Sequence, residues 1–156
     1  MQLKFHKALA TVFGIGYINK GGGTVSAFLY CLIYYMFSGF INQNYNYVLQ
    51  ITCVIAAGIW SSNVLEKYWG KDSNKIVVDE FVGMQISLLF ISPNILNIII
   101  AFVLFRVFDI YKPLLIKKTE QLPKGWGVMC DDILAGIYTN IILQIIFYIK
   151  LYVSIH

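Results

Sequence analysis

Apolar stretches alternate with polar or glycine-rich segments along the whole chain. The five longest stretches cover 24–41, 46–62, 76–92, 95–111 and 133–153. Because a helix needs about 20 apolar residues to cross the hydrocarbon core of a bilayer, the pattern predicts an all-α, integral membrane bundle of about five helices. The third and fourth stretches are shorter than that, and the segment 92–94 (SPN) separates them. We expect these two to form a short hairpin that is partly buried in protein.

Composition agrees with a membrane location. The 156 residues are 58% hydrophobic and only 13% charged, whereas soluble domains carry about 25% charged residues. A chain of this length predicts one domain, 1–156. The net charge is +4, and no lysine- or arginine-rich stretch resembles a nucleic-acid-binding patch. The apolar segment 8–18 has no A-x-A-like cleavage site after it, so it indicates an interfacial helix rather than a signal peptide.

The loops between the stretches are alternately basic and uncharged. Lysines precede the first stretch and lie between the second and the third, and more basic residues lie between the fourth and the fifth. The segments 41–46 and 92–97 carry no charge. Because basic loops remain on the cytoplasmic side of a membrane, we expect a cytoplasmic N-terminus and an external C-terminus.

The acidic residues are expected on the cytoplasmic side only, and five of them lie at the membrane boundary of the last three stretches. These five are Asp79, Glu80, Asp109, Asp131 and Asp132. Ionisable groups at membrane depth are costly, so this clustering indicates a functional site. Gly83 lies four positions after Asp79, and Gly136 lies four positions after Asp132. Small residues one helical turn away would let another helix or a ligand approach closely.

Two interpretations of the acidic residues stay open. They could be helix-end charges that pair with lysines and reach toward the interface. Alternatively, they converge on a hard divalent cation such as Mg²⁺, which takes oxygen ligands and often substrate phosphate. Arg106, Asp109 and Lys112 are spaced by three along one helix face, which Pro113 is expected to end. In the second interpretation, Arg106 and nearby lysines would hold anionic oxygens.

A glycine-rich segment precedes the first apolar stretch. Residues 14–24, GIGYINKGGGT, end at Thr24, where the first long helix is expected to begin. Free backbone N–H groups at a helix start bind anions, although glycine clusters of this kind are more often plain loops. The spacing fits neither a Walker A nor a Rossmann fingerprint. Histidine occurs only at positions 6 and 156, so the sequence gives little support for a histidine nucleophile or a Ser-His-Asp triad.

Four blocks of sequence together resemble the phosphatidylglycerophosphatase A family. They are GIGYINKGGGT at 14–24, VVDEFVGM at 77–84, FRVFDIYKP at 105–113 and GWGVMCDDILAG at 125–136. The blocks occur in the order that is typical of that family. Gly22 and Leu114 stand where the family usually has proline, and Lys124 stands where it commonly has glycine.

The resemblance implies a Mg²⁺-dependent membrane phosphatase that removes the terminal phosphate from phosphatidylglycerophosphate in phospholipid biosynthesis. It also implies a multi-pass protein of the bacterial inner membrane with its active site facing the cytoplasm. The implied catalytic residues are Asp79, Glu80, Asp109, Asp131 and Asp132. The implied metal ligands are Asp79, Glu80, Asp109 and Asp132. The implied substrate-binding residues are Arg106, Lys112, Lys20, Gly23, Thr24 and Lys124.

Two other classes of protein remain compatible with the residues. A small transporter or channel with a carboxylate cation site would place its charges deep in the spans, on a path open to both faces. A non-catalytic membrane assembly factor would need no indispensable carboxylate. For the enzyme, two chemical routes stay open, namely attack by metal-activated water and attack by an aspartate that forms an aspartyl-phosphate.

Overall fold

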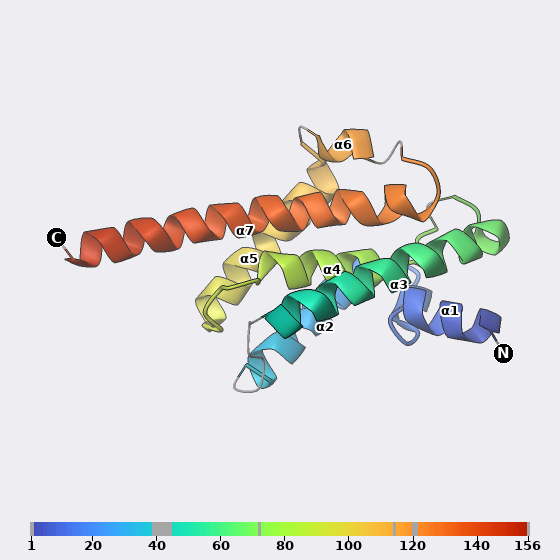
Figure 1. Ribbon diagram of the computed structural model, residues 1–156, viewed down its shortest axis with the longest axis horizontal. Helices are drawn as coiled ribbons and strands as arrows, with labels where there is room; N and C mark the ends of the chain where they lie inside the picture. The colour runs from blue at the N-terminus through green and yellow to red at the C-terminus, as the bar shows by residue number, and fades with distance from the viewer. Residues whose placement is uncertain (1, 39–44, 72, 114, 120–121, 156) are drawn as a thin grey trace.

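The chain folds into helices that pack along one another (Figure 1). The structure is a computed structural model that describes residues 2–38, 45–71, 73–113, 115–119 and 122–155, so that Asp72, Leu114 and Glu120 lie outside it. Within these ranges it contains seven α-helices, one 3₁₀ helix and no strand. The elements are α1 (Gln2–Ala10), η1 (Ile15–Tyr17), α2 (Gly22–Met36), α3 (Tyr45–Trp69), α4 (Val78–Ser87), α5 (Ile95–Tyr111), α6 (Ile116–Thr119) and α7 (Gly125–Ile155).

The five expected stretches correspond to α2, α3, α4, α5 and α7, but most of their bounds differ from the prediction. α5 covers the expected 95–111, whereas α3 continues past 62 to Trp69 and α7 begins at Gly125 instead of 133. Among the described helices, α3 and α7 are the two that are long and apolar enough to cross a membrane. The all-helical class is therefore confirmed, and the count of five spans is not.

The N-terminal helix also lies earlier than predicted. The segment 8–18 was expected to be helical, but α1 ends at Ala10. The Thr11 hydroxyl donates to the Lys7 carbonyl at 2.7 Å and accepts from the Gly14 amide at 2.9 Å. Gly14 then adopts a φ of 107°, which a residue without a side chain tolerates. The chain therefore turns sharply before η1 and reaches the start of α2.

α4 is a short helix in the middle of the packing. Its 10 residues rise only about 15 Å, which is half of the hydrocarbon core of about 30 Å. Most of its side chains are buried, and it packs against α7, α2, α3 and α5 (Figure 1). The expected third span, 76–92, therefore contains a half-length buried helix that precedes α5.

The C-terminal end of α4 is paired by amide side chains of α7. Asn140 donates to the carbonyl of Ser87 at 3.2 Å and to the carbonyl of Leu89 at 2.7 Å. Gln144, one turn further along α7, donates to the carbonyl of Leu89 at 3.4 Å. The last carbonyls of a helix have no partner within the helix, and buried carbonyls that stay unpaired are costly. These amides therefore allow α4 to end inside the bundle.

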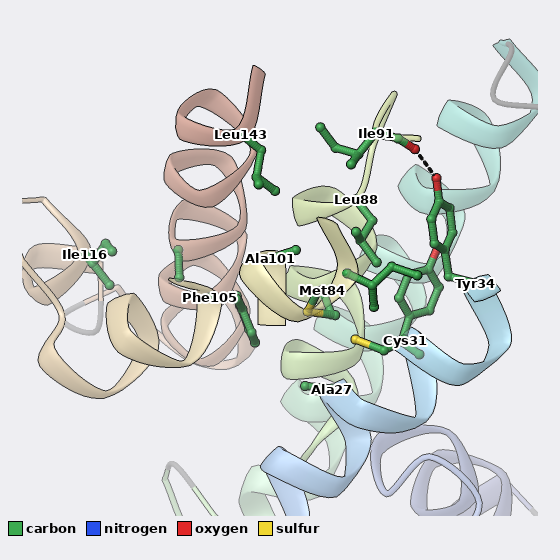
Figure 2. Packing of buried hydrophobic residues seen from close by; sticks show 13 residues of the cluster. Ala27, Cys31, Tyr34, Met84, Leu88, Ile91, Ala101, Phe105, Ile116 and Leu143 are labelled. Atoms are coloured by element: carbon green, nitrogen blue, oxygen red, sulfur yellow. Dashed lines mark hydrogen bonds between the residues drawn. The ribbon is translucent and has the colours of Figure 1, made fainter. Parts of the chain in front are cut away.

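Figure 2 shows the apolar cluster around the same end of α4. Met84 and Leu88 are fully buried there, next to the equally buried Phe105 of α5. Tyr34 of α2 donates its hydroxyl hydrogen to the carbonyl of Ile91, just beyond α4 (Figure 2). Packing and hydrogen bonding thus hold α4 from α2, α5 and α7 at once.

Two glycines bring the backbones of α4 and α7 into direct contact. A Cβ atom on Gly136 would lie 2.4 Å from the carbonyl oxygen of Gly83. A Cβ atom on Gly83 would lie 2.5 Å from the ring of Phe105 and 2.8 Å from the carbonyl oxygen of Asp132. All three distances are too short for a side chain, so the predicted close approach at these small residues is confirmed.

Replacing Asn140 with leucine should lower the free energy of unfolding by about 1–3 kcal/mol, the cost of leaving buried carbonyls unpaired. Gln144→Leu is the matched control and should cost less, because its contacts at 3.4 and 3.5 Å are longer. Thermal unfolding of both purified variants in one detergent measures the difference. An Asn140→Leu protein as stable as the wild type would show that these hydrogen bonds do not hold the end of α4.

Candidate active site

Three carboxylates converge where the start of α4 meets α7. Asp79 and Glu80 occupy the first turn of α4, and Asp132 lies in the second turn of α7. Each offers one oxygen, and these oxygens lie within 4.8 Å of one another. They meet because Gly83 and Gly136 bring the two helices together one turn further on. We refer to Asp79, Glu80 and Asp132 as the acidic cluster.

The acidic cluster is buried and short of partners. Asp79 Oδ1, Glu80 Oε2 and Asp132 Oδ1 are buried and have no hydrogen-bond partner within the described part of the chain. Burial raises the pKa of both Asp79 and Glu80. The neighbouring charges of Glu80 and Asp132 raise the pKa of Asp79 further. A cation placed among these oxygens would relieve both the burial and the repulsion.

The start of α2 lies against Glu80. A Cβ atom on Gly23 would be 1.7 Å from Glu80 Oε1, so only glycine fits here while the Glu80 side chain keeps its position. α2 begins at Gly22, two residues before the expected Thr24, and follows Gly21 with a φ of 84°. A helix start carries unpaired N–H groups and the positive end of the helix dipole. The glycine-rich segment therefore brings the positive end of a helix beside Glu80.

Asp109 lies beside the acidic cluster and is already paired with a cation. Arg106 Nη1 donates to Asp109 Oδ2 at 2.5 Å, across one turn of α5. Asp109 is also close enough to Asp132 for their charges to act on each other. Arg106 is close enough for its charge to act on Glu80 as well. Asp109 is therefore paired with an arginine at the edge of the cluster, whereas the interpretation above named pairing with lysines.

Asp131 forms a second ion pair. Lys112 Nζ donates to Asp131 Oδ2 at 2.6 Å, which joins the end of α5 to α7. Lys112 follows α5 in a left-handed conformation with a φ of 45°. It precedes Pro113, and the prediction that α5 ends there is confirmed. The adjacent aspartates thus differ in their surroundings, because Asp131 meets a lysine and Asp132 meets the other carboxylates.

The remaining residues predicted to bind substrate are not gathered at one place. Thr24 follows Gly23 in the first turn of α2 and so lies at the helix start beside Glu80. Lys20 is exposed in the turn before α2. Lys124 lines a different pocket, of about 630 Å³, together with Lys67 of α3. Of these residues, the structure brings Gly23 and Thr24 to the acidic cluster and places Lys124 elsewhere.

Sequence reasoning missed the contacts that position the start of α4. The Ser26 hydroxyl of α2 donates to the carbonyl of Val77 at 2.6 Å. The amide of Val77 in turn donates to the carbonyl of Ala10, at the end of α1, at 2.9 Å. Val77 directly precedes α4, so these bonds orient the turn that carries Asp79. A signal was present, because Ser26 lies three positions after Gly23 and therefore on the same helix face.

The fold and the site define an all-helical protein with buried carboxylates beside a helix N-terminus. Comparisons with known proteins indicate an enzyme that acts on a phosphate group. Residues 8–147 match the phosphatidylglycerophosphatase A family. No solved structure matches the chain. The chain therefore belongs to the phosphatidylglycerophosphatase A family, and it is a lipid phosphatase. The resemblance seen in the four sequence blocks is confirmed, and an enzyme is favoured over a transporter or an assembly factor.

Individual relatives cover most of the chain. A Bacteroides thetaiotaomicron protein named "Putative phosphatidylinositol-3-phosphatase" is 39% identical over 143 residues, which cover 88% of this chain and 90% of the relative. Phosphatidylglycerophosphatase A of Haemophilus influenzae is 33% identical over 142 residues, 90% of this chain and 87% of the relative. The Escherichia coli protein of the same name is 33% identical over 141 residues, 88% of this chain and 81% of the relative.

Gly23→Ala should reduce activity without unfolding the protein. The added Cβ would meet the end of the flexible Glu80 side chain, not backbone, so Glu80 should leave the cluster while α2 stays in place. We expect kcat/KM for a lipid phosphate to fall roughly tenfold or more, about 1.4 kcal/mol, with little change in Tm. Gly22→Ala is the matched control, because its Cβ would lie no closer than 3.3 Å to another atom. Equal losses in both variants would assign the effect to the helix start instead of Glu80.

Proposed function

We propose that the chain hydrolyses phosphatidylglycerophosphate to phosphatidylglycerol and inorganic phosphate, with Mg²⁺ held by the acidic cluster, as a step of phospholipid biosynthesis. The observation that carries this proposal is the convergence of three buried carboxylates, each with an unpartnered oxygen. The substrate comes from the name of the family to which the chain belongs.

The donor set suits Mg²⁺. Asp79, Glu80 and Asp132 offer oxygens only, and Asp109 lies next to Asp132 as a further carboxylate. Mg²⁺ is a hard cation that is usually held by one or two carboxylates, substrate phosphate and several waters, so this set leaves room for substrate. When bound, the ion would neutralise phosphate charge and orient or activate water.

The groups around the cluster would hold the phosphate. The guanidinium of Arg106 has five N–H donors in a planar fork, and its contact with Asp109 is made through Nη1. The fork matches two oxygens of a phosphate, which a lysine cannot do. The N–H groups at the start of α2, around Gly23 and Thr24, would face the same anion. Carboxylates for the cation and donors for the phosphate therefore lie next to one another, with Arg106 beside Asp109 and the start of α2 beside Glu80.

The reaction is the hydrolysis of a phosphate monoester. The bond from phosphorus to the glycerol oxygen breaks, an oxygen from water becomes bonded to phosphorus, and the glycerol oxygen leaves with a proton. Water can attack directly, or Asp79 or another carboxylate can attack first and give an aspartyl-phosphate that water then hydrolyses. Rapid acid quenching of enzyme with labelled substrate separates the routes, since only the second leaves a phosphoryl group on the protein.

Extensive exposed apolar surface supports a membrane location. α5 exposes Ile99, Val103 and Ile110, and α7 exposes Ile141 and Ile145. Only 33% and 28% of the most apolar windows of α3 and α7 are buried. Large apolar patches are rare on soluble proteins that have no partner. We place α2, α3 and α7 across the bilayer, with the acidic cluster and the N-terminus toward the cytoplasm and the C-terminus outside, because α2 is also apolar although it has only 15 residues.

A second lipid substrate has a specific observation in its favour. The relative at 39% identity is named for phosphatidylinositol 3-phosphate, and this lipid also carries a phosphate monoester on a headgroup. Phosphate release from both lipids by the purified protein, with Mg²⁺ and with EDTA, tests the proposal. Faster release from phosphatidylinositol 3-phosphate would replace the proposed substrate, and equal release in EDTA would remove the proposed metal.

Asp79→Asn and Asp132→Asn should each abolish Mg²⁺-dependent phosphate release while the protein stays folded. Removing a carboxylate ligand should cost several kcal/mol of transition-state stabilisation. Binding of Mn²⁺ in place of Mg²⁺, followed by electron paramagnetic resonance, should weaken in parallel and reports on the site without turnover. Glu66→Gln is the control, because this acid lies in the pocket that Lys124 lines. Near wild-type turnover in both aspartate variants would refute the cluster as the active site.

Arg106→Lys should lower kcat/KM by roughly tenfold or more, about 1.4 kcal/mol. Lysine keeps the positive charge beside Asp109 but lacks the fork that matches two phosphate oxygens. The affinity for Mg²⁺ should change much less than kcat/KM. The opposite pattern, with activity retained and a shifted Mg²⁺ dependence, would mean that Arg106 positions Asp109 and does not hold substrate.

The proposed orientation predicts which exposed positions an impermeant thiol reagent reaches in intact cells. In a background without Cys31, Cys53 and Cys130, a cysteine at Lys118 should stay unlabelled and a cysteine at Val153 should react. Both positions are exposed on the protein, so the membrane alone decides access. Labelling at position 118 but not at 153 would reverse the orientation.

A further inference from the structure

A long apolar groove opens beside the first turn of α4. It has a volume of about 410 Å³, and its walls come from three helices. The residues that line it include Ala8 and Phe13 of the N-terminal segment, Cys53 and Ala57 of α3, and Val78 and Phe81 of α4. Nearly all of the surface inside the groove is apolar, so it offers nothing to a charged or hydrogen-bonding ligand.

The groove and the acidic cluster share one turn of helix. Val78 and Phe81, which line the groove, directly flank Asp79 and Glu80 in the sequence of α4. Because successive side chains of a helix point in different directions, the carboxylates of this turn reach Asp132 of α7 and the start of α2, while Val78 and Phe81 line the groove and the ring of Phe81 also packs against Tyr30 of α2. A ligand with a phosphate at the cluster therefore has hydrocarbon walls within reach of its other end.

The far wall of the groove is held in an unusual backbone conformation. Val12 and Phe13 follow α1 with φ values of 46° and 55°, a left-handed region that is unfavourable for a β-branched residue. Phe13 is 93% exposed. Thr11 supports the turn through its bonds to Lys7 and Gly14. Val12 and Phe13, which line the groove, are thus held in a strained backbone conformation.

We propose that this groove holds one acyl chain of the lipid phosphate while its headgroup lies at the acidic cluster. The ligand class rests on the lipid phosphatase assignment, and the proposal does not depend on which headgroup is correct. A lipid tail gains little by moving from a bilayer into an equally apolar groove. The groove therefore acts by orienting the substrate, and its signature is a dependence of the rate on acyl-chain length.

Ala57→Phe fills the groove and provides the test. With a long-chain lipid phosphate, kcat/KM should fall roughly tenfold, about 1.4 kcal/mol, whereas a short-chain form of the same lipid should be hydrolysed as by the wild type. Ala56→Phe is the matched control, because this neighbouring residue is exposed and does not line the groove. Unchanged chain-length dependence in Ala57→Phe, or the same change in Ala56→Phe, would overturn the proposal. Ala8→Phe fills the groove from α1 and replaces Ala57→Phe if that variant does not fold.

A binding experiment that does not depend on catalysis can test this proposal independently of the proposed function. Wild-type protein in EDTA is irradiated with a lipid phosphate that carries a photoreactive group at the end of one acyl chain, and the labelled peptides are identified by mass spectrometry. Labelling of α1 and of the segment around Cys53 would support the groove even if phosphatidylglycerophosphate proved to be the wrong substrate. Labelling spread over the exposed faces of α5 and α7, or confined to them, would refute it.

Discussion

The close contact of α4 and α7 at Gly83 and Gly136 is the constraint on which the rest of the structure depends. No side chain fits between these backbones, so the two helices cross at one fixed place. Asp79 and Glu80 lie one turn before this crossing on α4, and Asp132 lies one turn before it on α7. The crossing therefore determines that carboxylates from distant parts of the chain share one space.

Such a crossing places a short helix inside the bundle, and both of its ends need support. At the far end, Asn140 and Gln144 pair the carbonyls that α4 leaves open. At the near end, Ser26 holds the residue that precedes α4, and the carboxylates lie without enough partners. The protein thus satisfies backbone groups where only stability is needed and leaves carboxylate oxygens unpaired where chemistry is proposed. Clustered, unpaired charge is costly, and its retention in a buried place is the physical argument for a bound cation.

A lipid phosphatase has to bind a charged headgroup and an apolar acyl chain of the same molecule. The first turn of α4 borders both proposed binding sites. Its carboxylates converge with Asp132 of α7, while Val78 and Phe81 line apolar walls. The headgroup site and the proposed acyl site therefore need no separate domain. Their relative position is set by a single helical turn, which makes the first turn of α4 sensitive to any change that rotates or shifts it.

The sequence alone was enough to identify the helical class, the family and the five carboxylates around the site, because apolar length and motif order are local properties of the chain. It also predicted the close approach at Gly83 and Gly136, because the spacing of small residues can be read directly from the sequence. It did not separate the carboxylates by their roles. Only the tertiary structure showed that Asp109 and Asp131 meet cations whereas Asp79, Glu80 and Asp132 meet one another. That difference depends on which helices cross, and at what depth. These are outcomes of packing between segments that lie far apart in the sequence, and no local pattern records them.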